Sequence, residues 1–484
     1  MSSDALPSVA EVIEAALPRA RWFAGKGRAA HVRALVPLPW LTDDELPAVR
    51  FEIAEVVDPV APEWVEHYLV PLCYRSAADP LGPGLGVAAH AALGAVAVHD
   101  ASADPYAHDV LLGFVARSRD VVEGTNRLQC RVLDTSRLRP GLPARRFGGE
   151  QSNTSVMYAS IAMLKFFRRL EFGGENLDIE IHRELADGPA RGRLAGLMSW
   201  LTAEWIDSDH QVRSADLGML VDQVPNAADG WDLAVASVVD GTDFTAYATE
   251  LGHALREVHA GLAEAFGTTT LPGAEQSATM RRRLVDAIPE VDELTPLHGA
   301  LDSRLAWLGD IDHTVQRIHG DFHLGQVLLA RSGPNPGWRI IDFEGEPLKP
   351  LAERRAPDTV WRDVAGLLRS FDYAGAFATR QEGVQPESAA AWVAACREAF
   401  LLAYAGHPLT SEEHHILQAY QIDKAIYECR YEKRNRPEWL PIPLAALASV
   451  AAESLATPVA GSTEQLATPV AGEPNASEGE NHGR

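Results

Sequence analysis

The chain has 484 residues, of which 46% are hydrophobic and 23% are charged, an ordinary mixture for a globular protein. Its length exceeds what one hydrophobic core usually holds, so we expect two or three packed units. The formal net charge of −24 argues against a nucleic-acid-binding surface or an anionic membrane as the main partner.

The sequence carries no sign of secretion or membrane insertion. No run reaches the roughly 20 apolar residues that a membrane span needs, and the N-terminus lacks the apolar h-region of a signal peptide. Cys73, Cys130, Cys396 and Cys429 lie far apart and form no C-x-x-C pair. We therefore predict reduced structural thiols in preference to a metal site, and a cytoplasmic protein.

Taken in chain order, the patterns change from β-rich to α-rich. Residues 1–95 mix alternating segments such as "VRFEIAEVV" with breaks such as "DPLGPGLG", which indicates a small β-rich unit. Residues 96–225 carry the strand-like runs "DVLLGFVA" and "SVMYASIAMLKFF", then the helical pattern "NLDIEIHRELAD". Residues 226–450 are mainly helical, as in "FTAYATELGHALREVHAGLAEAF". Residues 451–484 repeat "LATPVAG" before a polar, acidic end, which predicts a disordered tail.

The most informative stretch is "RIHGDFHLGQVLL", followed closely by "WRIIDFEGEP". It places Asp321 on a tight loop, Gln326 five residues later and Asp342 at the end of a strand. Such an oxygen-rich set suits Mg²⁺, which commonly binds through one or two protein groups plus substrate phosphates. Phosphoryl transfer needs a carboxylate that accepts the proton of the attacking hydroxyl and a metal that neutralises phosphate charge.

This stretch resembles the catalytic loop of the aminoglycoside-phosphotransferase-like kinases, which reads H-G-D followed by Asn or Gln and then by a strand that ends in Asp. The resemblance implies that Asp321 is the catalytic base and that Gln326 and Asp342 are the Mg²⁺ ligands. The alternative is structural, with Asp321 capping a turn and His319 and His323 packed as hydrogen-bonded residues. The spaced glutamine and the segment "IIDFE" favour the kinase interpretation.

A kinase also needs a cradle for ATP, and "FGGEQSNTSVMY" is the predicted one. A turn of small residues between strands presents backbone N–H groups to phosphates, and a lysine on the next strand reaches the α- and β-phosphates. We predict Lys165 in that role, held by Glu180 as a glutamate holds it in the related protein kinases. Adenine is expected to pair with the backbone from Asp222 to Val224. The residues of the turn are Ser152, Asn153, Thr154 and Ser155. The alternative is a plain hairpin with a solvated lysine.

Four segments resemble the actinobacterial maltokinases: "RWFAGKGR", "EQSNTSV", "IDFEGEPLKPLAERRAPDTVWRDVAGLLRSFDYA" and "DKAIYECRYEKRNRPEWLPIPL". The resemblance implies an α+β, bilobal protein-kinase-like fold with an N-terminal β-rich cap subdomain and a helical C-lobe. It also implies ATP-dependent phosphorylation of maltose at the reducing-end C1 hydroxyl, giving maltose 1-phosphate for α-glucan and glycogen synthesis. A functional link to trehalose synthase or another α-glucan enzyme would follow.

Two departures leave the acceptor open. The segments "EFGGENLDIEIHREL" and "GPARGRLAGLMSWL" match the maltokinase pattern poorly. A neighbouring group of the same fold phosphorylates glucosamine to glucosamine 6-phosphate and would share the nucleotide and catalytic motifs. A catalytically inactive pseudokinase scaffold is the third alternative, although base, metal and nucleotide positions all survive in the right order.

The helix pattern near the C-terminus predicts the sugar site. Carboxylates accept hydrogen bonds from sugar hydroxyls, and an aromatic ring packs on the apolar face of a pyranose. The residues placed at the substrate are His323, Glu428, Tyr431, Glu432, Arg436 and Trp439. The alternative is a surface helix with an intrahelical Glu428–Glu432–Arg436 ladder, with Trp439 as a core anchor. An ammonium group suits the same carboxylates, so glucosamine stays open.

Two further residues are expected to be structural. Asp363 and Arg369, in "WRDVAGLLRSF", are predicted to brace a C-lobe helix against the catalytic loop. His259, in "REVHAGL", is predicted to pack between helices.

Overall fold

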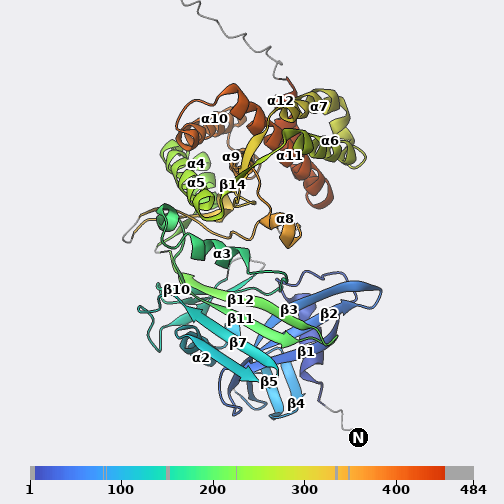
Figure 1. Ribbon diagram of the computed structural model, residues 1–484, viewed down its shortest axis with the longest axis vertical. Helices are drawn as coiled ribbons and strands as arrows, with labels where there is room; N and C mark the ends of the chain where they lie inside the picture. Colours follow the sequence, from blue (N-terminus) through green and yellow to red (C-terminus); the bar gives the residue numbers. More distant parts are fainter. Residues whose placement is uncertain are drawn as a thin grey trace, which may run out of the picture.

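The computed structural model describes residues 6–79, 81–82, 84–148, 153–224, 226–332, 336–346 and 349–452. It has an α+β architecture, as predicted. Figure 1 shows the two large sheets stacked at one end of the molecule and a helical lobe at the other. The described part of the chain contains no helix with the length and apolar character needed to cross a membrane.

The N-terminal cap is an antiparallel sheet of five strands in the order β1-β2-β3-β5-β4. Its elements are α1 (Val9–Ala16), β1 (His31–Trp40), β2 (Ala48–Asp58), β3 (Ala61–Ser76), β4 (Gly86–His90) and β5 (Gly94–Asp100). The cap sheet extends five residues beyond the predicted limit at 95, because β5 pairs with both β3 and β4 and buries Val96 and Val98.

The N-lobe is a second sheet, of seven strands in the order β6-β7-β11-β12-β10-β9-β8. Its elements are α2 (Pro105–Val115), β6 (Arg119–Glu123), β7 (Asn126–Val132), β8 (Ala144–Arg146), β9 (Thr154–Tyr158), β10 (Ala162–Phe166), α3 (Leu177–Glu184), β11 (Leu197–Ile206) and β12 (Val212–Asp222). The strand predicted from "DVLLGFVA" is wrong, because these residues belong to α2. Asp104 accepts hydrogen bonds from the N–H groups of Tyr106 and Ala107, and Pro105 occupies the first helical position, which together start a helix.

The cap and the N-lobe share one hydrophobic core. Phe51 and Leu69 of the cap pack in the same buried cluster as Leu164 and Phe166 of the N-lobe. The rings of Phe51 and Phe166 meet edge to face with centroids 5.8 Å apart. The two sheets therefore form a sandwich in which the cap covers one face of β9 and β10.

The C-lobe is mainly helical. Its elements are β13 (Ala228–Asp229), α4 (Gly230–Asp240), α5 (Thr245–Phe266), β14 (Thr268–Leu271), α6 (Gly273–Ala287), α7 (His298–Trp307), β15 (His313–Gln316), η6 (Leu324–Gln326), β16 (Val327–Ala330), β17 (Gly337–Ile340), α8 (Leu351–Arg355), α9 (Trp361–Gln381), α10 (Pro386–Ala405), α11 (Ser411–Asn435) and α12 (Pro441–Ala452). The predicted tail lies outside the described residues, apart from Ala451 and Ala452, which end α12.

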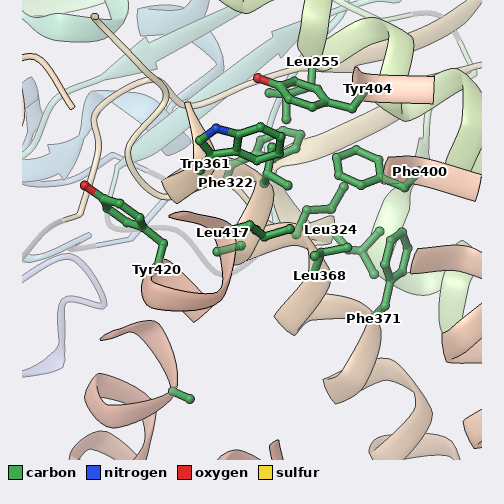
Figure 2. Packing of buried hydrophobic residues seen from close by; sticks show 14 of the residues in the cluster. Leu255, Phe322, Leu324, Trp361, Leu368, Phe371, Phe400, Tyr404, Leu417 and Tyr420 are labelled. Atoms are coloured by element: carbon green, nitrogen blue, oxygen red, sulfur yellow. The ribbon is translucent and has the colours of Figure 1, made fainter. Parts of the chain in front are cut away.

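The core of the C-lobe fixes the loop that precedes β16. Figure 2 shows Phe322 and Leu324 among Leu368 and Phe371 of α9 and Phe400 of α10. All five side chains are at most 2% exposed. The loop between β15 and β16 is therefore anchored by the apolar packing of Phe322 and Leu324.

Candidate active site

Lys165 of β10 lies at the centre of a cluster of carboxylates. Its ammonium group is 2.9 Å from a carboxylate oxygen of Asp178 and 2.8 Å from those of Asp342 and Glu344. Burial opposes the charge of Lys165, but the three carboxylates outweigh it and raise the pKa of the lysine well above its usual value. The predicted nucleotide lysine is thus brought together with the predicted metal-bearing strand.

The prediction that Glu180 holds Lys165 is wrong, since Asp178 does so. Both acids lie on α3, but two residues apart on a helix they point about 200° away from each other. Glu180 pairs with Arg317 and Arg355. The Asp178 carboxylate also accepts a hydrogen bond from the N–H of Phe343, at 3.1 Å, which ties α3 to the metal-bearing segment.

The arrangement around Asp342 fits a divalent cation. Asp178, Asp342 and Glu344 place one carboxylate oxygen each within 4.8 Å of one another, while Lys165 supplies a single positive charge. Gln326 donates to Asp342 at 3.3 Å, so the two residues predicted as metal ligands lie together. Burial, together with the neighbouring carboxylates, raises the pKa of Glu344 to about 7 despite Lys165. A bound cation would relieve this repulsion, and oxygen donors of this type suit Mg²⁺.

Replacing Asp342 with asparagine should raise the Mg²⁺ concentration needed for half-maximal activity by roughly tenfold or more, since a charged ligand is lost. Asp342 has a left-handed backbone (φ 67°), which asparagine adopts readily, so the fold should persist. The measurement is an Mg²⁺ titration of activity, with exposed Asp310→Asn as the control. An unchanged Mg²⁺ requirement would remove Asp342 from the metal site.

The catalytic loop is held by Asp363 from α9. Its carboxylate accepts hydrogen bonds from the backbone N–H groups of His319, at 2.8 Å, and Gly320, at 2.9 Å. His259 lies 2.9 Å from the same carboxylate and 2.8 Å from the hydroxyl of Tyr404. The predicted bracing role of Asp363 and the packing role of His259 are both confirmed.

Arg369 braces a different pair of elements from the one predicted. It pairs with Glu428, at 2.7 Å, and with Asp372, so it joins α9 to α11. The catalytic loop is instead joined to this part of α9 by Ser370, whose hydroxyl accepts from the N–H of Leu324 at 3.0 Å.

A cavity of about 280 Å³ adjoins Asp321. Lys424 of α11 extends its ammonium group to 3.5 Å from the Asp321 carboxylate, and Tyr427 and Glu346 line the same cavity. Burial, together with the Glu346 and Asp321 carboxylates, raises the pKa of Tyr427, which keeps its hydroxyl protonated as a donor. Sequence reasoning missed this set, although Lys424 and Tyr427 lie three apart, the spacing of one helix face.

The acids predicted to bind the sugar make ion pairs and hydrogen bonds within the protein. Glu428 is bound by Arg369, while Glu432 pairs with Arg436 at 2.6 Å and accepts from Tyr373 at 3.0 Å. None of the residues predicted at the sugar is among the described residues that line the cavity. They are Glu428, Tyr431, Glu432, Arg436, Trp439 and His323. Their contact with the sugar stays a prediction, which followed from carboxylate and aromatic spacing alone.

The remaining residues predicted at the sugar include Trp439, Tyr431 and His323. The Trp439 ring stacks on Tyr373, with centroids 6.3 Å apart, and Tyr431 is exposed. The side chain of His323 accepts from the N–H of Gly325 at 3.1 Å and so caps η6.

The predicted phosphate turn is described from Asn153 onward, and Ser152 lies outside the described residues. Asn153 donates to Glu344 at 2.9 Å, and Ser155 lies opposite Lys165 in the β9–β10 register. Both therefore lie beside the carboxylate cluster. Thr154, between them, makes its side-chain contact on the side of the cap.

The predicted hinge joins β12 to the C-lobe. The N–H of Asp222 donates to Gly196 at 2.8 Å, and that of Gln223 donates to Ile161 at 3.0 Å. The N–H groups of Asp222 and Gln223 are therefore already bound, and Val224 belongs to the apolar cluster at this end of the cleft; the pairing of this backbone with adenine stays a prediction.

A lysine–carboxylate cluster beside a loop-borne aspartate, between a sheet lobe and a helical lobe, defines a phosphotransferase of the kinase class. Residues 17–104 match the maltokinase N-terminal cap domain, and residues 218–392 match the phosphotransferase enzyme family. The chain therefore combines a match to a maltokinase-type cap domain with a match to the phosphotransferase enzyme family.

Two curated relatives are glucosamine kinases. The chain is 28% identical over 340 residues to that of Streptacidiphilus jiangxiensis, covering 63% of this chain and 73% of the relative. It is 28% identical over 331 residues to that of Mycolicibacterium smegmatis, covering 64% and 79%.

Solved structures of glucosamine kinase share the fold. One, in complex with glucosamine, ADP and inorganic phosphate, superposes with a TM-score of 0.57 at 22% identity, covering 92% of this chain and 99% of that one. Crystal form B of glucosamine kinase gives 0.60 at 22% identity, with the same coverage.

Proposed function

We propose that the protein is an Mg-ATP-dependent sugar kinase whose acceptor is glucosamine, phosphorylated at its C6 hydroxyl. The observation that carries this proposal is the small cavity beside Asp321, which is bounded by the carboxylate of Glu346 and the hydroxyl of Tyr427. A carboxylate pairs with the ammonium group of an amino sugar, which at Glu346 would share the carboxylate with Lys349, 2.8 Å away, and a volume of about 280 Å³ suits one pyranose ring better than two. The relatives named as glucosamine kinases support the same acceptor.

In the proposed mechanism Asp321 orients the acceptor hydroxyl and takes its proton as the hydroxyl oxygen bonds to the γ-phosphorus of ATP and the bond from that phosphorus to the β,γ-bridging oxygen breaks, releasing ADP. Lys424, 3.5 Å from that carboxylate, would balance negative charge as the phosphoryl group passes. Lys165 would bind the α- and β-phosphates of ATP, and the Val224 N–H would pair with adenine. Gln326 and Asp342 would hold Mg²⁺, which neutralises phosphate charge when bound.

Maltose is the second candidate acceptor, with C1 phosphorylation. The cap domain match favours it, because that domain is described for maltokinases. The carboxylates predicted at the sugar, Glu428 and Glu432, are bound to Arg369 and Arg436. Glu346 is likewise paired with Lys349, so ion pairing does not separate the two acceptors. The proposed link to trehalose synthase depends on this second candidate.

The test compares kcat/KM for glucosamine, maltose and glucose in a coupled ADP-release assay at saturating Mg-ATP. We expect glucosamine to be preferred, and Glu346→Gln to raise its KM by roughly tenfold or more, since a charge-assisted hydrogen bond contributes about 1.5–3 kcal/mol. The same variant should leave the KM for glucose within about threefold.

The control is Glu398→Gln on the exposed side of α10. A tenfold preference for maltose, with Glu346→Gln affecting every sugar equally, would assign maltose. The absence of ADP release with any of the three sugars would favour the pseudokinase alternative.

A further inference from the structure

Arg168 is a fully buried arginine between the cap and the strands that carry the nucleotide site. It follows β10 and is 0% exposed. Its guanidinium donates to the hydroxyl of Thr154 at 2.8 Å, to the carboxylate of Asp100 at 2.8 Å and to the carbonyl of Leu69 at 3.3 Å. The ring of Trp22 lies 5.1 Å from it. Leu69, Asp100 and Trp22 belong to the cap, whereas Thr154 begins β9.

The register of β9 and β10 explains why Thr154 is within reach of the cap. Ser155 lies opposite Lys165, and Thr154 lies opposite Phe166. Side chains alternate between the two faces of a sheet, so one pair faces the carboxylate cluster and the other faces the cap. Phe166 indeed packs on Phe51 of the cap.

The backbone of the cap is joined to the same strand pair. The N–H of Leu69 donates to the carbonyl of Arg168 at 2.8 Å, and the N–H of Leu170 donates to that of His67 at 2.8 Å. Strand β3 therefore continues its pairing into the segment just after Lys165. Besides the shared apolar core, the cap pairs by its backbone with the segment that follows β10, and Arg168 of that segment contacts Thr154 of β9.

From Thr154 the contacts continue to the reacting centre. The adjacent Asn153 donates to Glu344 at 2.9 Å, and Glu344 lies 2.8 Å from Lys165. The path from Asp100 to Lys165 therefore runs through hydrogen bonds and ion pairs between described residues. The hydroxyl of Thr154 is the side-chain contact between Arg168 and β9, and it adds to the backbone pairing of β9 with β10.

We infer that Arg168 is a positioning residue for nucleotide binding, through which the cap holds the start of β9 over the Lys165 site. The inference rests on the proposed function, in that Asn153 and Ser155 are taken to face the nucleotide phosphates. It makes the cap a part of the nucleotide site although no cap residue reaches Lys165 itself among the described contacts.

The test removes the single hydrogen bond and leaves the buried ion pair intact. Arg168 itself is unsuitable, because its loss would strand the charge of Asp100 in the core. Thr154→Val keeps the shape of the side chain and deletes the acceptor, whereas Thr154→Ser keeps the hydroxyl. Thr202→Val on β11 is the matched control, since its hydroxyl has no partner among the described residues.

We expect Thr154→Val to weaken Mg-ADP binding, measured by isothermal titration calorimetry, by roughly tenfold, and to raise the KM for ATP similarly. The KM for the sugar should stay within about twofold, and Thr154→Ser and Thr202→Val should stay within about threefold of the parent protein. Ser102→Ala removes the hydrogen bond, 3.3 Å long, that Arg168 donates to the Ser102 hydroxyl. This variant should also weaken Mg-ADP binding, but by less than Thr154→Val.

A folded Thr154→Val protein with unchanged Mg-ADP affinity would overturn the inference. So would an equal rise in the KM values of ATP and sugar together with a lower melting temperature, because that pattern marks a purely structural role. If Thr154→Val does not fold, Ser102→Ala decides: unchanged Mg-ADP affinity rejects the inference. Failure of the parent protein to bind Mg-ADP would overturn the proposed function, and this inference with it.

Discussion

Replacing Asp321 with asparagine is expected to lower kcat by roughly 10²–10⁴-fold, because the change keeps the shape of the side chain and removes the proton acceptor. The melting temperature and the affinity for Mg-ADP should stay close to those of the parent protein. Asp363 holds the loop by its backbone N–H groups at His319 and Gly320, so the loop does not depend on the Asp321 carboxylate.

The control for this variant is Asp310→Asn, an exposed aspartate eleven residues earlier on the chain. Turnover should be followed at saturating sugar and Mg-ATP so that kcat is separated from KM. Retention of more than about a tenth of the parent kcat would argue against proton transfer to Asp321.

Asp178→Asn is expected to lower kcat/KM for ATP by roughly 10²-fold, whereas Glu180→Gln should change it by only a few-fold. Asp178 is buried and lies 2.9 Å from Lys165. Removal of one partner of a buried ion pair lowers the stability of the folded arrangement by about 3–5 kcal/mol. Without Asp178, the lysine would be drawn fully toward Asp342, in competition with the metal.

Glu180→Gln serves as the matched control on the same helix. It should lower the melting temperature instead, because Arg317 and Arg355 lose their shared carboxylate. Equal activity losses in the two variants would show that α3 as a whole, and not the Asp178 carboxylate, sets the position of Lys165.

The catalytic loop was predictable because its signals are local. Asp321, Gln326 and Asp342 lie within two short segments, and the strand and turn between them fix their relative positions. Gln326 and Asp342 do lie in contact. The bracing role of Asp363 was also within reach, since a buried carboxylate next to a loop needs N–H donors.

The partner of Lys165 and the residues of α11 that line the cavity were not predictable. Both depend on how a helix is rotated about its axis when it packs. Asp178 and Glu180 are both acids in the first turn of α3, and packing alone decides which one faces β10. Likewise, α11 is polar around much of its circumference, so the sequence pattern does not single out the face with Lys424 and Tyr427. Helix α2 was missed because "DVLLGFVA" is a nearly continuous apolar run, which periodicity alone does not assign to a strand or a helix.

Helix α11 carries two tasks on neighbouring residues. Lys424 and Tyr427 line the cavity beside Asp321, while Glu428 is fixed to Arg369 on α9. Substitutions at the first two positions can therefore reshape the cavity while the ion pair that seats the helix is kept. Kinases of this type can therefore change their sugar specificity through substitutions at a few neighbouring positions of a helix whose ion pair to α9 is retained. Relatives with different acceptors should then differ at these two positions more than at Arg369.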